Sequence, residues 1–436
     1  MKRIILLLMI FASVSAFSQG IDERIGDAIN QEKWQILRNL YENEGAKLQT
    51  PILHPLSKFF ISHSYNQPDS ALFYGTKLLN EYQAALGSSV GGIIFLMAGD
   101  FAKRGEYDNA AGILKQYNAA VKASGAAPDP IFVAYENQYS TIAQKGGFSM
   151  FRPHKEIKVP IRYLNSRTEP GQIRVDIQLN NQPHDAVYDT GAGENIMSRR
   201  LADRLNLHVY DFTGTAIAGI NVSKSSFAIV DSLRLGEIVY KNVPFQVVDF
   251  NTGHQEADSA IEKIKMNCII GVRSMLPLKE IQFDFKNGFL KIPAYPSETP
   301  SFAPNVYYSG EGLLVMSVLD KKTNKKINAM LDTGSAITSL TAKYYMANKQ
   351  FFDNVVPDDS VRIAGIGGVK ILKTISTSWE YSINGSHFMK EPVAININED
   401  SDADGVSKYD CLFGLPSFSK YDCVIINFKE MFLKFE

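Results

Sequence analysis

Val187-Tyr188-Asp189-Thr190-Gly191-Ala192 and Met330-Leu331-Asp332-Thr333-Gly334-Ser335 are two copies of one pattern, an apolar strand end followed by Asp-Thr-Gly, 143 positions apart. Two later pairs keep this offset: Cys268-Ile269-Ile270-Gly271 precedes Cys411-Leu412-Phe413-Gly414, and Phe285-Lys286 precedes Phe428-Lys429. One Asp-Thr-Gly can arise by chance in a chain of 436 residues. Two copies in step with two further motifs indicate a duplicated unit.

The two aspartates are the candidate catalytic residues. A glycine after Asp-Thr permits the tight turn that presents a carboxyl group at the end of a strand. If the copies face each other across an approximate two-fold axis, Asp189 and Asp332 lie side by side. Carboxylates that close cannot both ionise, so the pair shares one proton and contains a base and an acid. Such a pair can activate a water against a peptide carbonyl without a metal or a covalent intermediate.

These motifs resemble those of the aspartic proteases of the pepsin and retropepsin clan, over about residues 155–436. The resemblance implies that Asp189 and Asp332 form the catalytic pair and that Thr190 and Thr333 hydrogen-bond across the axis. It also implies a peptide or protein substrate, no cofactor and no metal. The residues expected to support the catalytic loops are Thr190, Gly191, Ala192, Thr333, Gly334, Ser335, Ile270, Gly271, Phe413 and Gly414.

Members of this family close a mobile hairpin, the flap, over the substrate. Ala364-Gly365-Ile366-Gly367-Gly368-Val369 is similar to the glycine-rich flap tip of the retropepsins, and Ala218-Gly219-Ile220-Asn221 is a weaker counterpart in the first copy. Glycines let such a hairpin move and exclude water. An ordinary β-turn is the alternative for each stretch. The flap and substrate-binding candidates are Ala218, Gly219, Ile220, Gly365, Ile366, Gly367 and Gly368.

The residue after each Asp-Thr-Gly differs, with Ala192 in the first copy and Ser335 in the second. A hydroxyl that donates to Asp332 would favour the charged form of that carboxyl group. We therefore expect Asp332 to be the base and Asp189 to hold the shared proton, although a coupled pair titrates as a unit. Activity is expected to be highest below neutral pH.

From about residue 150 the sequence is typical of short strands. Apolar and polar residues alternate from Ile173 to Leu179, as in a half-buried strand. The stretch Phe283–Ile292 contains Lys286-Asn287-Gly288, and Asn-Gly is a strong hairpin signal. A proline-rich stretch then predicts a linker. The expected protease lobes are residues 151–296 and 297–436.

Residues 19–150 are expected to form helices. Ser70–Leu86 and Tyr107–Ala123 are rich in residues that favour helix. Gly105-Glu106-Tyr107-Asp108, followed by Ala110, resembles the turn and second helix of a tetratricopeptide repeat, although the Trp-Leu-Gly elements are absent. We expect helical hairpins that either bind a protein partner or support the rest of the chain.

Residues 1–18 have the layout of a secretory signal peptide. Lys2 and Arg3 precede the apolar run Ile4–Val14, and small or polar residues follow up to Gln19. The run is too short for a stable membrane-spanning helix. We expect an exported protein, periplasmic or extracellular.

Several other kinds of protein are disfavoured. Near-equal charge, 45 Lys+Arg against 46 Asp+Glu, argues against a nucleic-acid binder. No internal run reaches the roughly 18 apolar residues that are needed to span a bilayer. Asp400-Ser401-Asp402-Ala403-Asp404-Gly405 matches half of an EF-hand loop, but Cys411 stands where the bidentate Glu is needed. The histidines show no metal-ligand spacing. Cys268 and Cys411, at equivalent positions, are expected to be small buried packing residues.

Together these observations predict a multidomain protein. It has an N-terminal all-α helical-hairpin domain and two all-β acid-protease lobes related by pseudo-two-fold symmetry. The predicted function is that of an exported, monomeric aspartic-type endopeptidase, a hydrolase that uses Asp189 and Asp332, with a protein partner as a further candidate ligand of the helical domain. The alternative is a catalytically idle peptide-binding or scaffold protein that uses the same fold for recognition.

Overall fold

The computed structural model describes residues 20–166, 171–218, 221–250, 266–310, 312–353, 355–358, 360–365, 368–398 and 408–436, with a few single residues between 255 and 264. The expected signal peptide and the EF-hand-like stretch lie outside the described residues. The chain divides into a helical unit, residues up to Phe148 with Tyr307–Gly310, and a β unit, Ser149–Val306 with Glu311–Glu436.

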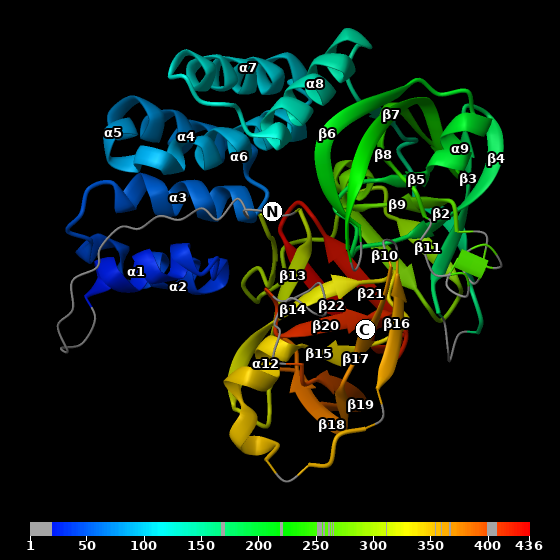
Figure 1. The fold of residues 1–436 in the computed structure, drawn as a ribbon. Coiled ribbons are helices and arrows are strands. Elements are labelled where there is room, and N and C mark those ends of the chain that lie inside the picture. Colours follow the sequence, from blue (N-terminus) through cyan, green and yellow to red (C-terminus); the bar gives the residue numbers. More distant parts are fainter. Residues whose placement is uncertain are drawn as a thin grey trace. The chain divides into compact units, whose positions relative to one another are not determined.

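The helical unit consists of consecutive helices, drawn from blue to cyan in Figure 1, in which neighbours along the chain pack on one another. This confirms the expected N-terminal helical region. The helices are α1 (Ile21–Asn30), α2 (Trp34–Glu44), α3 (Leu53–Ser64), α4 (Pro68–Glu81), α5 (Gln83–Leu86), α6 (Val90–Lys103), α7 (Tyr107–Ala123) and α8 (Pro130–Gln144).

Local signals mark where two of these helices begin. The Asp129 carboxylate caps α8 by accepting from the N–H of Ile131 at 2.9 Å, and Pro130 takes the first helical position. Pro68 likewise takes the first helical position of α4. By length and composition alone, the helical run Gln83–Lys103 is apolar enough to cross a membrane, and half of its most apolar window is buried.

A buried charge cluster joins α3 to α6. Asp100 is fully buried, and its carboxylate lies 2.8 Å from His63 Nδ1 and 2.9 Å from Lys103 Nζ. Burial raises the pKa of Asp100, but His63 and Lys103 outweigh burial and lower the pKa below its usual value. Lys103 Nζ also lies 5.3 Å from the centre of the Tyr308 ring, within the segment Tyr307–Gly310 that belongs to the helical unit.

The β unit carries both copies, green and then yellow to red in Figure 1. The strands of the first copy are β1 (Ser149–Phe151), β2 (Ile157–Tyr163), β3 (Ile173–Leu179), β4 (Gln182–Tyr188), β5 (Ile196–Ser198), β6 (Val209–Ala218), β7 (Asn221–Leu235), β8 (Ile238–Val248), β9 (Cys268–Ile270), β10 (Glu280–Asp284) and β11 (Phe289–Ile292). Its short helices are α9 (Arg199–Arg204) and α11 (Val272–Met275).

The second copy follows the first in the chain. Its strands are β12 (Val306–Tyr308), β13 (Leu314–Asp320), β14 (Lys325–Asp332), β15 (Ser339–Leu340), β16 (Val361–Gly365), β17 (Gly368–Leu372), β18 (Thr374–Ser382), β19 (Met389–Asn396), β20 (Cys411–Gly414), β21 (Cys423–Asn427) and β22 (Phe432–Phe435). Its short helices are α12 (Ala342–Ala347) and α13 (Leu415–Phe418).

Among the described residues these strands form a 13-stranded sheet, a seven-stranded sheet and a two-stranded ribbon. The large sheet runs β22-β21-β10-β11-β2-β3-β4-β9-β5-β8-β7-β6, with β1 beside β8. The second sheet runs β12-β13-β14-β20-β15-β19-β18, and β16 pairs with β17.

Two sequence predictions about strands are confirmed. The alternating stretch Ile173–Leu179 is β3, although Arg174 is also buried because it pairs with Asp185 at 2.5 Å. The Asn-Gly stretch joins β10 to β11 as a hairpin, with Gly288 in the left-handed region at φ 76°.

The two copies join through the antiparallel pair β10 and β21. Glu280 lies opposite Asn427, and Asp284 lies opposite Cys423. Cys423 follows Glu280 by 143 positions, and Asn427 follows Asp284 by 143. The register is therefore unchanged when the two copies are exchanged, as in an isologous interface.

Candidate active site

Each Asp-Thr-Gly turn begins where an inner strand ends. In the first copy β4 runs parallel to β9, and the N–H of Asp189 donates to the Ile270 carbonyl at 3.0 Å. In the second copy β14 runs parallel to β20, with Asp332 opposite Gly414. Both carboxyl groups are thus carried by strand ends, which hold side chains more rigidly than free loops.

Thr190 and Thr333 join the two turns by four hydrogen bonds. Thr190 Oγ1 donates to the Leu331 carbonyl at 3.1 Å and accepts from the N–H of Thr333 at 3.0 Å. Thr333 Oγ1 donates to the Tyr188 carbonyl at 2.8 Å and accepts from the N–H of Thr190 at 3.0 Å. Both threonines are fully buried. Each bond has a counterpart with the copies exchanged.

The two carboxyl groups share one backbone donor. The N–H of Gly334 donates to Asp189 Oδ1 at 3.1 Å and to Asp332 Oδ1 at 2.9 Å. The N–H of Gly191 donates to Asp189 Oδ1 at 2.7 Å. A Cβ on Gly191 would lie 2.6 Å from Asp332 Oδ1, and a Cβ on Gly334 would lie 2.7 Å from Asp189 Oδ1. The close approach of the turns therefore requires glycine at both positions.

The protein environment disfavours two charges at this point. Burial raises the pKa of Asp189 above its usual value, although the hydrogen bond from Gly191 opposes the shift. Burial also raises the pKa of Asp332 well above its usual value, and the negative charge of Asp189 raises it further. Both aspartates keep some exposed surface, so solvent reaches the pair. Both shifts favour a pair that holds one shared proton.

The expected role of Ser335 is wrong. Its hydroxyl donates to the Ile337 carbonyl at 3.0 Å and accepts from the Ile337 N–H at 3.3 Å, instead of donating to Asp332. A serine hydroxyl readily closes a turn with the backbone two residues on, and that local bond wins here. The reason for expecting Asp332 to be the base is thereby removed.

The bracing glycines lie against the segments that follow the aspartates. A Cβ on Gly271 would overlap the Glu194 carbonyl, and a Cβ on Gly414 would overlap the Ile337 carbonyl. Gly271 extends β9, which contains Ile270, and Gly414 ends β20, which contains Phe413. Both apolar neighbours are buried.

Ala192 and Ser335 also contact the bracing segments. The Ala192 carbonyl accepts from the N–H of Val272 at 2.8 Å, and the Ser335 carbonyl accepts from the N–H of Leu415 at 3.0 Å. The support that the resemblance implies for these two positions thus runs through their backbone.

Sequence reasoning missed two supporting side chains, each six positions after its aspartate. The N–H of Gly271 donates to Asn195 Oδ1 at 3.1 Å, and the N–H of Gly414 donates to Thr338 Oγ1 at 3.0 Å. Asn and Thr differ, so inspection for identical residues overlooks them. The shared offset of 143 was a usable signal.

The expected flaps lie in paired strands. β6 and β7 pair up to Ala218 opposite Asn221, and β16 and β17 pair up to Gly365 opposite Gly368. The tips between these pairs are Gly219-Ile220 and Ile366-Gly367, which lie outside the described residues.

The three cysteines are free thiols that lie buried or half-buried. Cys268 and Cys411 are buried, which confirms their expected packing role, and burial raises the pKa of Cys423 to about 11. In the part of the chain that is described, no group of three or more His, Cys, Asp or Glu is placed to hold a metal ion.

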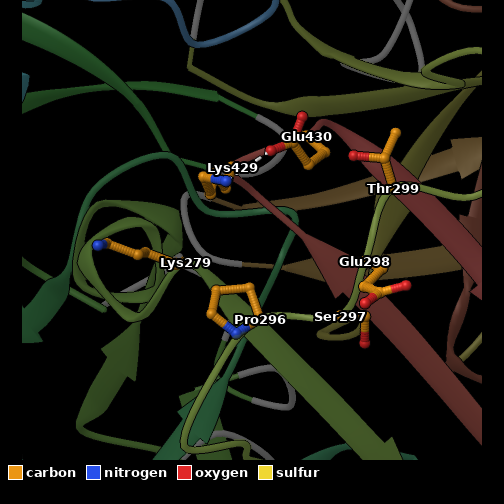
Figure 2. Close-up of a pocket in the computed structure, with 7 residues that line it drawn as sticks. All are labelled: Lys279, Pro296, Ser297, Glu298, Thr299, Lys429 and Glu430. Carbon is orange, nitrogen blue, oxygen red and sulfur yellow. Dashed lines mark ion pairs between the residues drawn. The ribbon is translucent and has the colours of Figure 1, made fainter.

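Figure 2 shows a pocket of about 390 Å³ that contains none of the predicted site residues. Its charged groups have both signs, and Lys429 is paired with Glu430 at 2.8 Å. It is lined by Lys279, Pro296, Ser297, Glu298, Thr299, Lys429 and Glu430.

Comparison with known proteins gives one family match. Residues 175–272 match the model of the family described as aspartyl protease, a segment that includes Asp189 and Gly271. No curated protein matches the chain.

Solved structures that resemble the chain include two crystal structures. A retropepsin-like aspartic protease from Rickettsia conorii is 16% identical, covers 33% of this chain and 92% of its own, and has a TM-score of 0.23. Basic 7S globulin from soybean is 9% identical, covers 65% of this chain and 95% of its own, and has a TM-score of 0.36. Since both TM-scores are below 0.5, it is the family match that supports an aspartic protease fold, in the part of the chain that it covers.

Proposed function

We propose that this protein is an aspartic endopeptidase in which Asp189 and Asp332 together activate a water for attack on a peptide carbonyl. The observation that carries the proposal is the single N–H of Gly334, which donates to Oδ1 of both aspartates. Two carboxyl groups held within reach of one nitrogen, partly open to solvent, are arranged for shared acid–base chemistry.

Asp189 and Asp332 have different roles in proton transfer. Asp189 is the base, because its Oδ1 accepts from the N–H groups of both Gly191 and Gly334, and such bonds favour the charged form. Asp332 holds the proton and donates it to the substrate carbonyl while Asp189 takes a proton from the water. The tetrahedral intermediate then collapses: its C–N bond breaks, the leaving amine takes the proton from Asp189, and a hydroxyl of the intermediate returns its proton to Asp332. No metal or covalent intermediate enters this scheme.

The bilobal arrangement is part of the proposal. The exchangeable register of β10 and β21, and the four exchangeable threonine bonds, support two lobes related by a pseudo-two-fold axis. An extended peptide would lie between the lobes and pair with a flap at 218–220 or 365–368. The subsites of such a cleft accept side chains on both sides of the scissile bond, as an endopeptidase requires.

Export and the helical domain complete the proposal. The N-terminal charge and apolar run support a signal peptide, which N-terminal sequencing of the exported protein tests by a start near Gln19. The Gly105-Glu106-Tyr107-Asp108 turn between α6 and α7 supports a tetratricopeptide-like role, in which the helices bind a protein partner.

Cleavage of an unfolded protein by the exported chain, followed by mass spectrometry from pH 3 to pH 8, tests the function. We expect internal cleavage and a bell-shaped pH profile, since one carboxyl group must be ionised and the other protonated. Because the pKa of both groups is raised from 3.8, the acid limb lies above that pH. Binding of peptides without cleavage at any pH would favour the idle scaffold instead.

A further inference from the structure

A buried chain of polar groups ends at the strand beside Asp332. The N–H of Gly414, opposite Asp332 in the ladder, donates to Thr338 Oγ1 at 3.0 Å, and Thr338 Oγ1 lies 2.6 Å from Ser417 Oγ. Ser417 Oγ donates to Glu391 Oε1 at 2.7 Å, and the other oxygen of Glu391 pairs with Lys420.

The Glu391 carboxylate sets the direction of this chain. A carboxylate only accepts hydrogen bonds, so the Ser417 hydroxyl must donate to it. Ser417 Oγ then accepts from the Thr338 hydroxyl. Thr338 Oγ1 in turn accepts from the N–H of Gly414. Every donor along the chain thus points towards one charge, and such aligned bonds reinforce one another at low dielectric.

Burial of the Glu391 carboxylate costs folding free energy, because the charge is removed from water. Glu391 is 3% exposed and Ser417 is fully buried, whereas the Lys420 side chain is 35% exposed. A buried ion pair is often no more stabilising than apolar residues of the same volume. General stability is therefore a weak explanation for Glu391.

In the first copy, the position that corresponds to Glu391 carries no charge. β5 pairs Ile196 with Gln246, and β15 pairs the equivalent Ser339 with Ala394. Counting back three residues in each strand matches Val243 with Glu391. Val243 is fully buried.

In that copy the loop is anchored by an amide. Asn195, the counterpart of Thr338, accepts from Gly271 and donates through Nδ2 to the Pro244 carbonyl at 3.1 Å. Ser274, the counterpart of Ser417, is buried, and its hydroxyl has no hydrogen-bond partner among the described residues. Within the described parts of the two copies, it is the Asp332 side whose anchor runs through side chains to a charge.

We propose that Glu391 is a positioning residue for the Asp332 turn, acting through Ser417, Thr338 and Gly414. It keeps β20 tight against β14, so that Asp332 stays at hydrogen-bonding distance from Asp189. The inference rests on the proposed hydrolytic function, because the position of Asp332 matters for turnover only if Asp332 reacts.

The test compares Glu391→Val with the wild-type protein. We expect kcat to fall at least tenfold with KM changed less than twofold, because the substrate contacts remain while the reacting group is displaced. We also expect faster amide hydrogen exchange in a peptide covering 411–414. Glu391→Gln, which keeps an acceptor for Ser417, should give a smaller loss of kcat.

Two further variants separate positioning from general stability. Thr338→Asn combined with Glu391→Val transplants the anchor of the first copy, because the new amide can reach the Pro392 carbonyl as Asn195 reaches Pro244. We expect this double variant to recover most of the lost kcat. Asp320→Asn is the matched control, a fully buried carboxylate in the same copy that accepts from Thr323, Tyr344 and Trp379.

Asp320 lies at the far end of the strand pair that carries Asp332, so its variant should lose stability without losing kcat or protection at 411–414. Equal effects of Glu391→Val and Asp320→Asn at equal loss of stability, or no recovery in the double variant, would overturn the inference. An inactive wild-type protein would overturn the proposed function instead, and the exchange measurement would still decide whether Glu391 holds the loop.

Discussion

Thr190 and Thr333 each donate a hydrogen bond to a carbonyl of the other copy and each accept one from the other's backbone N–H. Four buried bonds thus tie together two turns that are 143 positions apart in the sequence. These bonds hold the carboxyl groups of Asp189 and Asp332 at their common donor, the N–H of Gly334.

Replacement of Thr190 by valine keeps the shape of the side chain and removes the hydroxyl. The carbonyl of Leu331 and the N–H of Thr333 then lose their partner in a buried place, which costs about 2–4 kcal/mol of unfolding free energy. We expect kcat to fall as well, measured with a peptide substrate. Thr341→Val is the control, since the Thr341 hydroxyl donates to Tyr409 and caps α12 in equally buried surroundings. Equal loss of kcat in both variants would contradict the role given to Thr190.

Gly334→Ala introduces a Cβ where the Asp189 carboxyl group lies. Because that atom is rigidly attached to the backbone, the carboxyl groups must separate, and we expect activity to fall more than about 100-fold. Gly112→Ala in α7, where a Cβ meets nothing within 4 Å, should leave activity unchanged and raise stability by about 1 kcal/mol. Full activity of Gly334→Ala would show that the turns are farther apart than described.

Asp332→Asn should make the protein more stable at neutral pH. The folded-state pKa of Asp332 is raised, so the folded chain binds more protons than the unfolded chain and loses stability as pH rises above 3.8. Asparagine cannot ionise, so the variant avoids this loss. We expect its free energy of unfolding to exceed that of the wild-type protein by about 1–3 kcal/mol at pH 7 and to equal it at pH 3. Chemical denaturation at the two pH values measures the difference. A destabilised variant at pH 7 would contradict the raised pKa.

Asp100→Asn should have the opposite sign. The folded-state pKa of Asp100 is lowered, so its contribution is present above pH 3.8 and disappears as pH falls through the folded-state value. Removing one partner of this buried cluster should lower the free energy of unfolding by about 3 kcal/mol at pH 7 and by little at low pH. Unfolding is measured by the circular dichroism signal of the helices. The control is Asp69→Asn, whose partner Arg104 forms an exposed pair, and there we expect little change at either pH.

The sequence was informative where local chemistry determines structure. The two Asp-Thr-Gly turns, the alternation of β3 and the Asn-Gly hairpin are all local patterns, and the structure contains each of them. The pairing of Glu280 with Asn427 was not predicted, because strands so far apart in the chain can pair in many registers that bury the same faces.

The errors and omissions at the site have a common physical origin. The direction of the Ser335 hydroxyl is a choice between a nearby backbone carbonyl and a carboxyl group, and residue type alone does not decide it. Asn195 and Thr338 were missed because a backbone N–H can donate to several kinds of side chain. Glu391 was missed because it accepts from the Ser417 hydroxyl and reaches the Gly414 N–H only through other side chains. Arg174 was expected on the polar face of β3, but its ion pair with Asp185 allows it to be buried.

The most direct test of the central claim is the rate of cleavage of one peptide by Asp189→Asn and Asp332→Asn, each measured singly beside the wild-type protein. Base and acid are both required, so each amide should lower kcat/KM by at least about 1,000-fold while the chain stays folded. Retention of more than a tenth of the wild-type rate by either variant would contradict the claim that the two aspartates act as a pair.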